Sequence, residues 1–219
     1  MIIVTDDGSN SIFSAQHGVT YHSRYGAVTE SAHVFIAAGL RYKAVMQQDI
    51  RILETGLGTG LNAMMTWLEA EKRSLAVFYT ALEMFPVDMA AVEALNYPTL
   101  LDIPDRAADF HQIHQCPWEM EQKMSEAFHF TKHQAPIETY RSPESFDLIY
   151  FDAFAPQAQP ELWTEAVFQN MYDSLKPDGI LVTYCAQGEF KRSLKKAGFT
   201  VERLQGPPGK REMTRASRC

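Results

Sequence analysis

The feature that constrains this chain most is a glycine-rich turn between an apolar run and a helix-like pattern. The apolar run covers residues 50–54, and glycine follows at positions 56, 58 and 60. Apolar residues then recur at helical spacing, which predicts a strand, a tight loop and a helix over residues 61–72. Glycines allow positive φ and let backbone N–H groups and a helix N-terminus approach a ligand. The stretch therefore predicts an α/β domain with a nucleotide-like ligand.

The spacing of the glycines narrows the ligand. A dinucleotide fingerprint would need a third glycine at the position of Leu61. Glycines at alternate positions after an acid, here Glu54, suit S-adenosylmethionine better. A plain tight turn within an α/β domain is the alternative at this point.

Two further acids end apolar strand-like runs. Residues 75–82 have a buried-strand composition and lead to Glu83, while residues 146–151 form the clearest buried strand and lead to Asp152. The sequence separation between Gly60 and Glu83 is that at which nucleotide-binding folds present an acid to ribose hydroxyls. Since parallel strands end at one edge, Glu54, Glu83 and Asp152 should converge on one crevice. Exposed strand-end charges are the alternative.

The rest of the chain continues to alternate strands and helices. We expect a mostly parallel seven-stranded sheet with an antiparallel C-terminal hairpin, and an irregular, mostly helical connection over residues 98–127. A turn is predicted at 176–179. The other predicted helices cover 86–95, 161–175 and 188–197, the predicted strands cover 128–132, 180–184, 200–204 and 211–216, and residues 137–140 form a short strand or its exit.

The N-terminal segment differs from this alternation. Turn residues 7–10 between two short apolar runs predict a hairpin, and residues 28–42 predict a helix. We expect residues 1–48 to form an extension that acts as a lid over the site, and residues 49–219 to form the main domain.

Composition excludes several protein classes. The chain is 46% hydrophobic and 21% charged, and no apolar run approaches the roughly 20 residues that a membrane span needs. The N-terminus lacks the pattern of a signal peptide, so a cytoplasmic enzyme is expected. Three separated cysteines suggest reduced thiols. His111, His114 and Cys116 lack a second ligand pair, so no metal is expected.

Charge is distributed unevenly along the chain. Residues 191–219 hold nine lysines and arginines against two glutamates, although the whole chain has a net charge of −7. A basic patch on an acidic body is expected for a phosphate-rich partner. A solvated helix face followed by a basic tail is the alternative.

Several motifs carry a resemblance to a known family. Through them the chain resembles class I S-adenosylmethionine-dependent methyltransferases, which have a Rossmann-like fold. It resembles more closely the bacterial tRNA wobble-uridine methyltransferases of the MnmC/MnmD family. The Asp152-Ala-Phe-Ala-Pro156 segment and the Lys210-Arg-Glu-Met213 segment are the most specific of these motifs. The others are Tyr21-His-Ser, Glu30-Ser-x-His-Val-Phe35, Glu54-Thr-Gly-Leu-Gly-Thr-Gly-Leu-Asn62, Glu83 with Phe85-Pro86, Pro160-Glu-Leu-Trp163, Thr183-Tyr-Cys-Ala-x-Gly188 and Gly206-Pro-Pro-Gly209.

The resemblance implies an activity and roles for individual residues. It implies methylation of the 5-aminomethyl group of wobble (2-thio)uridine in tRNA, which gives 5-methylaminomethyl-2-thiouridine. Asp152 would hold the amine first, and would accept its proton only if burial raises its pKa. The expected cofactor contacts are Tyr21, Glu54, Gly56, Gly58, Gly60, Glu83 and Asp152, and the expected tRNA contacts are Phe154 and Pro156 around the base and Lys210 and Arg211 at phosphates.

Two departures from the family pattern matter. The bifunctional relatives carry a flavin-dependent oxidoreductase domain, and we expect this chain, which ends at Cys219, to act without one on tRNA that is already aminomethylated. Many class I enzymes place a Gly-Asp pair near adenine, whereas the corresponding stretch of this chain is Lys132-His-Gln-Ala-Pro136. Gln134 or a backbone group would take that role.

Two rival functions remain open at this point. A polyamine-type aminopropyltransferase would need additional acids, and the first acid after Asp152 is Glu161. A non-catalytic RNA-binding protein on the same fold is the other rival, and the intact glycines and strand-end acids argue against it.

Overall fold

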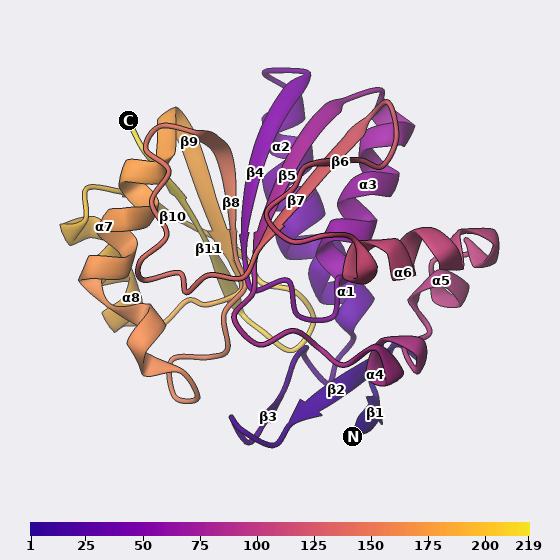
Figure 1. Ribbon diagram of the computed structural model, residues 1–219. Coiled ribbons are helices and arrows are strands. Elements are labelled where there is room, and N and C mark those ends of the chain that lie inside the picture. The colour runs from indigo at the N-terminus through magenta and orange to yellow at the C-terminus, as the bar shows by residue number, and fades with distance from the viewer.

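The structure is a computed structural model that describes residues 1–219. Its main element is an eight-stranded sheet in the order β10-β11-β9-β8-β4-β5-β7-β6, in which the five strands from β9 to β7 run parallel (Figure 1). The predicted seven strands are all present. The eighth, β6 (Gln122–Lys123), pairs antiparallel with β7 at one edge and was not predicted because it has only two residues.

Strand β4 (Asp49–Thr55) lies at the centre of this sheet. It pairs with β5 (Ala76–Leu82) on one side and β8 (Phe146–Phe151) on the other, both in parallel. The chain builds outward from β4 through β5 to β7 (Phe128–His133) and then crosses over to β8, so the strand order reverses between β4 and β8. In open α/β sheets such a switch point opens a crevice at the carboxyl ends of the strands.

The remaining strands extend the sheet in both directions. Residues 176–179, where a turn is predicted, fall within β9 but have no partners on β8. The pairing passes from Phe146 with Leu175 to Leu148 with Ile180, and Asp178 has φ 62. Residues 137–140 form a turn rather than a strand. The strands are β7 (Phe128–His133), β9 (Leu175–Thr183), β10 (Thr200–Gln205) and β11 (Glu212–Ser217), and the last two form the predicted antiparallel hairpin.

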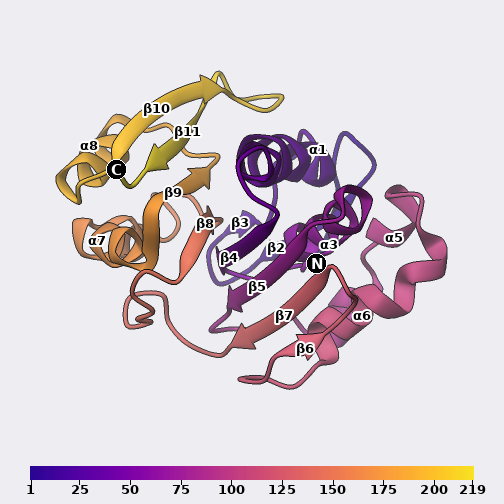
Figure 2. The same cartoon turned by 90° about the horizontal axis from the view of Figure 1, so that it is seen from above.

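Helices cover both faces of the sheet (Figure 2). One face carries α7 (Glu165–Ser174) and α8 (Gly188–Lys196). The other carries α3 (Leu61–Arg73), α6 (Ala107–Gln115) and a continuous helix formed by α1 (Ala27–Ser31), the π-helical η1 (Ala32–Arg41) and α2 (Tyr42–Ala44).

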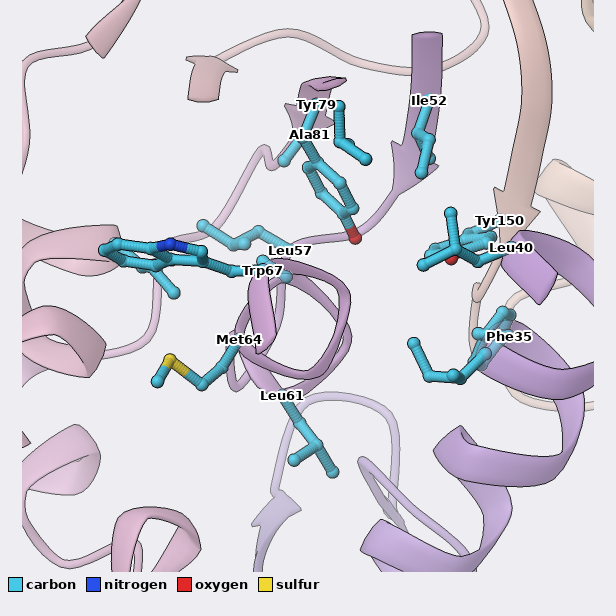
Figure 3. Close-up of a cluster of buried hydrophobic side chains, with 14 of the residues drawn as sticks. Phe35, Leu40, Ile52, Leu57, Leu61, Met64, Trp67, Tyr79, Ala81 and Tyr150 are labelled. Atoms are coloured by element: carbon cyan, nitrogen blue, oxygen red, sulfur yellow. The ribbon is translucent and has the colours of Figure 1, made fainter. Parts of the chain in front are cut away.

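Alternating strand residues supply the two cores. Ile52, Tyr79 and Tyr150 point toward α3 and η1, where they pack with Trp67 and Phe35 (Figure 3). The strand neighbours of these residues, such as Leu53 and Ile149, pack on the opposite face against α7 and α8. This period-two alternation on a sheet covered on both sides explains the nearly continuous apolar strand sequences.

Some predicted helices are shorter or divided. The helix predicted over 86–95 is reduced to α4 (Met89–Glu93), because Asp88 caps its N-terminus by accepting a hydrogen bond from Ala90 N. The helix predicted over 161–175 is split into η3 (Pro160–Trp163) and α7, with Thr164 as the cap of α7. The connection over 98–127 is helical only as far as Gln115, through α5 (Tyr97–Leu100), η2 (Pro104–Arg106) and α6, and the rest is irregular apart from β6.

The first part of the N-terminal segment, residues 1–20, lies below the carboxyl ends of the central strands (Figure 1). The predicted hairpin is confirmed by the pairing of β1 (Ile2–Val4) with β2 (Asn10–Ser14), and β3 (Val19–Thr20) adds a third strand. Helix η1 packs tightly on the main sheet, since a Cβ on Gly39 would lie 3.1 Å from Tyr150. None of the helices combines the length and apolar character that a membrane crossing requires.

Candidate active site

A cavity of about 360 Å³ opens at the carboxyl ends of β4, β5 and β8. Its wall is built from the loop after β4, the ends of β5 and β8, the segment after β7, and the β2–β3 hairpin with the residues that follow it. Its lining includes His17, Tyr21, Gly56, Gly58, Asn62, Glu83, Phe85, Asp152 and Phe154.

The glycine loop forms the floor of this cavity. The amides of Gly56 and Leu57 both donate to Leu82 O at 3.0 Å, which fastens the loop to the end of β5. Gly58 has φ 51, and a Cβ on it would lie 3.1 Å from the Tyr21 ring, so conformation and space both require glycine there. Gly60 lies behind the cavity wall, against the ring of His114. The Nε2 atom of His114 lies 3.2 Å from Thr59 O, so this histidine contacts the glycine loop.

Glu83 lies at the cavity beside the loop, as predicted from its strand-end position. Its Oε2 accepts a hydrogen bond from Gly58 N at 2.9 Å, and its Oε1 accepts one from Phe85 N at 2.8 Å. Burial raises the pKa of Glu83, while these backbone hydrogen bonds lower it. Each oxygen keeps a second lone pair, so the carboxylate can also accept hydrogen bonds from two adjacent hydroxyls.

Asp152 lies across the cavity at the end of β8. Its backbone N donates to Thr55 Oγ1 at 3.1 Å, and its Oδ2 accepts a hydrogen bond from Asn62 Nδ2 at 2.8 Å. Burial, together with the negative charge of Glu30, raises the pKa of Asp152 to about 7, against the opposing effects of Asn62 and Lys210. At neutral pH this carboxyl group can therefore both accept and release a proton.

Glu54 does not lie where the convergence of three acids predicted. It is 1% exposed and does not line the cavity, because the side chain of Asn62 lies between it and Asp152. Only Glu83 and Asp152 of the three acids face the cavity. Direct contact of Glu54 with the cofactor is therefore not what the structure shows.

Aromatic side chains form another wall. The ring of Phe154 lies 5.0 Å from that of Tyr21 in an edge arrangement and 4.6 Å from that of His17. Burial and the nearby Glu83 raise the pKa of Tyr21 to about 12, which keeps its phenol protonated. His17 was not predicted, because nothing in the sequence shows where the hairpin folds. Pro156 lies in the turn beyond Phe154, outside the cavity lining.

The basic tail is less available to phosphates than its sequence indicates. Lys210 turns inward, pairs with Glu30 and lies 3.7 Å from the ring centroid of Tyr184, and its predicted contact with a tRNA phosphate stays a prediction. Arg211 is exposed. Five of the nine tail cations pair with acids, and those without a carboxylate partner are Arg192, Lys195, Arg203 and Arg211.

The segment after β7 contributes differently from what was predicted. Gln134 is exposed, does not line the cavity, and donates its backbone N–H to Glu119 Oε1 at 3.0 Å. Residues 135–138 line the cavity instead. They include an acid, Glu138, four positions after Gln134. Recognition of adenine by a backbone group of this segment stays a prediction.

These features define the class of protein. A parallel sheet with a switch point, a glycine loop that fastens to the next strand, and an acid presented for vicinal hydroxyls together form an α/β site for a nucleotide-like ligand. A family model described as S-adenosyl-L-methionine-dependent methyltransferase matches residues 100–219. This is more than half of the chain, and the chain belongs to that family. The prediction of S-adenosylmethionine as the cofactor is confirmed.

The relatives are more specific in name. The tRNA 5-methylaminomethyl-2-thiouridine biosynthesis bifunctional protein MnmC of Aromatoleum aromaticum is 30% identical over 226 residues, 96% of this chain and 34% of that protein. The protein of the same name from Methylobacillus flagellatus is 31% identical over 218 residues, 92% and 33% of the two chains. This chain therefore spans about one third of the length of these curated relatives.

A solved structure supports the fold over the whole chain. The crystal structure of MnmC2 from Aquifex aeolicus superposes with a TM-score of 0.76 at 24% identity, covering 99% of this chain and 69% of that one. The predicted methyltransferase fold, with its mostly parallel sheet and C-terminal hairpin, is confirmed.

Proposed function

We propose that the protein transfers a methyl group from S-adenosylmethionine to the 5-aminomethyl group of wobble (2-thio)uridine in tRNA. The product would be 5-methylaminomethyl-2-thiouridine. The names of the relatives support the substrate. The observation that carries the chemistry is the position of Asp152, whose carboxyl group, with its pKa raised to about 7, lines the same cavity as the glycine loop.

The residues present fit the cofactor. Gly58 leaves the loop backbone open to the cavity, Glu83 has free lone pairs for ribose hydroxyls, and Tyr21 closes one side. When bound, S-adenosylmethionine supplies a methyl group that its sulfonium activates. The predicted roles of Gly56, Gly58, Glu83 and Tyr21 form part of this proposal, while Gly60 acts through the start of α3.

Asp152 prepares the amine for attack. A primary alkylamine is largely protonated at neutral pH, and it must lose a proton before its nitrogen can attack a methyl group. A carboxylate with a pKa near 7 can take that proton while a large fraction is still ionised. Correct placement of the two reacting groups would contribute further, up to roughly 7–11 kcal/mol in well-oriented systems.

The remaining contacts concern the tRNA. The rings of Phe154 and His17 offer a flat surface on which an unstacked base could rest, as single-stranded RNA bases do on aromatic side chains. Arg211 is the exposed cation next to Lys210 and would meet a phosphate. A tRNA substrate would also fit the predicted cytoplasmic location. Residues 1–48, whose β2–β3 hairpin lines the cavity, would act as the lid.

Label transfer tests this proposal. The protein is incubated with S-adenosylmethionine labelled in the methyl group and with tRNA that carries or lacks 5-aminomethyluridine. Label should enter only the aminomethylated tRNA. Transfer of the aminopropyl arm instead would indicate an aminopropyltransferase. Binding of tRNA with no calorimetric binding of S-adenosylmethionine would indicate an RNA-binding protein.

A further inference from the structure

Asn62 joins two carboxyl groups that come from different strands. It is the second residue of α3, and its side chain points back toward the glycine loop, as helical side chains do. Its Nδ2 donates to Glu54 Oε1 at 2.9 Å and to Asp152 Oδ2 at 2.8 Å. Asn62 is only 3% exposed, so both hydrogen bonds are shielded from water. The amide therefore uses both of its hydrogens to connect β4 with the end of β8.

The two oxygens of Asp152 have different surroundings. Oδ2 is held by Asn62, whereas Oδ1 has no hydrogen-bond partner in the protein and is not among the side-chain oxygens sealed from solvent. Because Asp152 lines the cavity, Oδ1 is the oxygen left free to accept a hydrogen bond from a ligand there. The hydrogen bond from Asn62 thus decides which oxygen of Asp152 is presented to a ligand.

Glu54 supports Asn62 from behind. Its Oε2 and the Oδ1 of Asn62 are both sealed from solvent without a hydrogen-bond partner. Burial raises the pKa of Glu54 well above its ordinary value, with a further contribution from Asp152. The raised pKa favours the protonated form of Glu54, in which a carbonyl oxygen still accepts the Asn62 hydrogen bond.

We propose that Asn62, backed by Glu54, is a positioning residue that fixes the Asp152 carboxylate with Oδ1 toward the amine. This inference rests on the proposed function only for the identity of the amine. It assigns Glu54 a role behind the site rather than on the cofactor. Leaving either carboxyl group without the amide would strand a buried acceptor, which is the costly case for hydrogen bonds in protein interiors.

Other charged groups also act on Asp152 and must be held constant. Glu30 of α1 raises its pKa, and Lys210 from the β10–β11 connection lowers it. Tyr184 and Tyr79 face it as phenols that burial keeps protonated. None of these groups hydrogen-bonds to Asn62, so replacing Asn62 changes the positioning contact and leaves their charges in place.

The test is the titration of Asp152 by carbon-13 carboxyl NMR in the protein without tRNA. In Asn62→Leu, which keeps the shape of the side chain without its donor, the midpoint should rise by about one pH unit or more. Asn62→Ala serves if the leucine variant does not fold. An unchanged midpoint in a folded variant overturns the proposal. Thr66→Ala, one turn further along α3 with its hydroxyl 3.3 Å from Tyr150, is the control and should leave the midpoint in place.

Glu54→Gln tests the second half of the proposal. Glutamine has the shape of the neutral acid and keeps a carbonyl for Asn62, so the Asp152 midpoint should stay where it is. A clear fall of the midpoint would mean that a negative charge had been removed, and would overturn the role of Glu54 as a neutral support. Because no step needs tRNA, these results stand apart from the label-transfer test of the proposed function.

Discussion

Lys210, between β10 and β11, pairs its ammonium group with the carboxylate of Glu30 in α1, 180 residues earlier in the chain. The pair brings two of the motifs that carry the family resemblance together beside Asp152. The ammonium group also lies 3.7 Å from the Tyr184 ring centroid, and the Tyr184 hydroxyl donates to Ala153 O at 2.8 Å. The N-terminal helix and the C-terminal hairpin are thus fastened together near the end of β8.

Removing either member of this pair should move the pH dependence of methyl transfer in opposite directions. In Lys210→Met the cation that stabilises ionised Asp152 is lost, so the acid limb of the rate profile should move to higher pH. In Glu30→Gln a neighbouring negative charge is lost, so the limb should move to lower pH. Turnover measured between pH 5 and 9 checks both shifts. Lys195→Met, on α8, is the control, and equal shifts in all three variants would contradict this account.

Gly58→Ala should weaken binding of S-adenosylmethionine by roughly tenfold or more, since a left-handed alanine costs about 1–2 kcal/mol and its Cβ would press on Tyr21. Calorimetric titration measures the change. Gly198→Ala is a close control, because Gly198 has φ +101 and its Cβ would lie 3.2 Å from the Tyr172 ring, away from the cavity. It should lose stability and keep its affinity. Equal loss of affinity in both variants would show that the effect is not local.

Asp152→Asn should make the protein more stable at pH 8 than the wild type. The folded state raises the pKa of Asp152 from 3.8 to about 7, so its favourable contribution is present below pH 3.8 and is lost as the pH rises through 7. Asparagine avoids the cost of the buried charge. The gain in free energy of unfolding, measured in urea, should therefore be larger at pH 8 than at pH 4. A gain of equal size at both values would count against the raised pKa.

Glu69→Gln should have the opposite dependence on pH. Arg41 of η1 donates to both oxygens of Glu69, from Nε to Oε1 at 2.6 Å and from Nη2 to Oε2 at 3.0 Å. The hydrogen bonds from Arg41 and Arg73 lower the pKa of Glu69 to about 2. The stability from these contacts is present above the unfolded pKa and is lost as the pH falls through 2. We expect a loss of about 1 kcal/mol at pH 7 that shrinks toward pH 3, measured by urea unfolding. Glu126→Gln, at an exposed pair with Lys123, should show almost none.

The sequence predicts the cavity better than its inner contacts. Glu83 and Asp152 could be placed because parallel strands end at one edge, so a strand assignment alone locates their side chains. The burial of Glu54 depends on a third element, α3, whose Asn62 fills the space between two strands. No spacing rule reveals such a contact.

The same limit applies to residues that reach the site from far away. His17 lies next to Phe154 only because the N-terminal hairpin folds back over the cavity. Lys210 turns inward because it pairs with Glu30, which lies far away in the sequence. Composition indicated a basic tail, yet ion pairs with acids on neighbouring elements use more than half of its cations. Charge counts along a chain do not show which charges are paired in space.

Mass spectrometry of wobble nucleosides tests the central claim most directly. Wild-type protein and Asp152→Ala are each incubated with S-adenosylmethionine and tRNA that carries 5-aminomethyl-2-thiouridine, and the tRNA is then digested. The wild type should convert this nucleoside to 5-methylaminomethyl-2-thiouridine, while Asp152→Ala should bind the cofactor within about tenfold of the wild type and leave the nucleoside unmethylated. An unchanged nucleoside with the wild type, or full conversion by Asp152→Ala, would contradict the account.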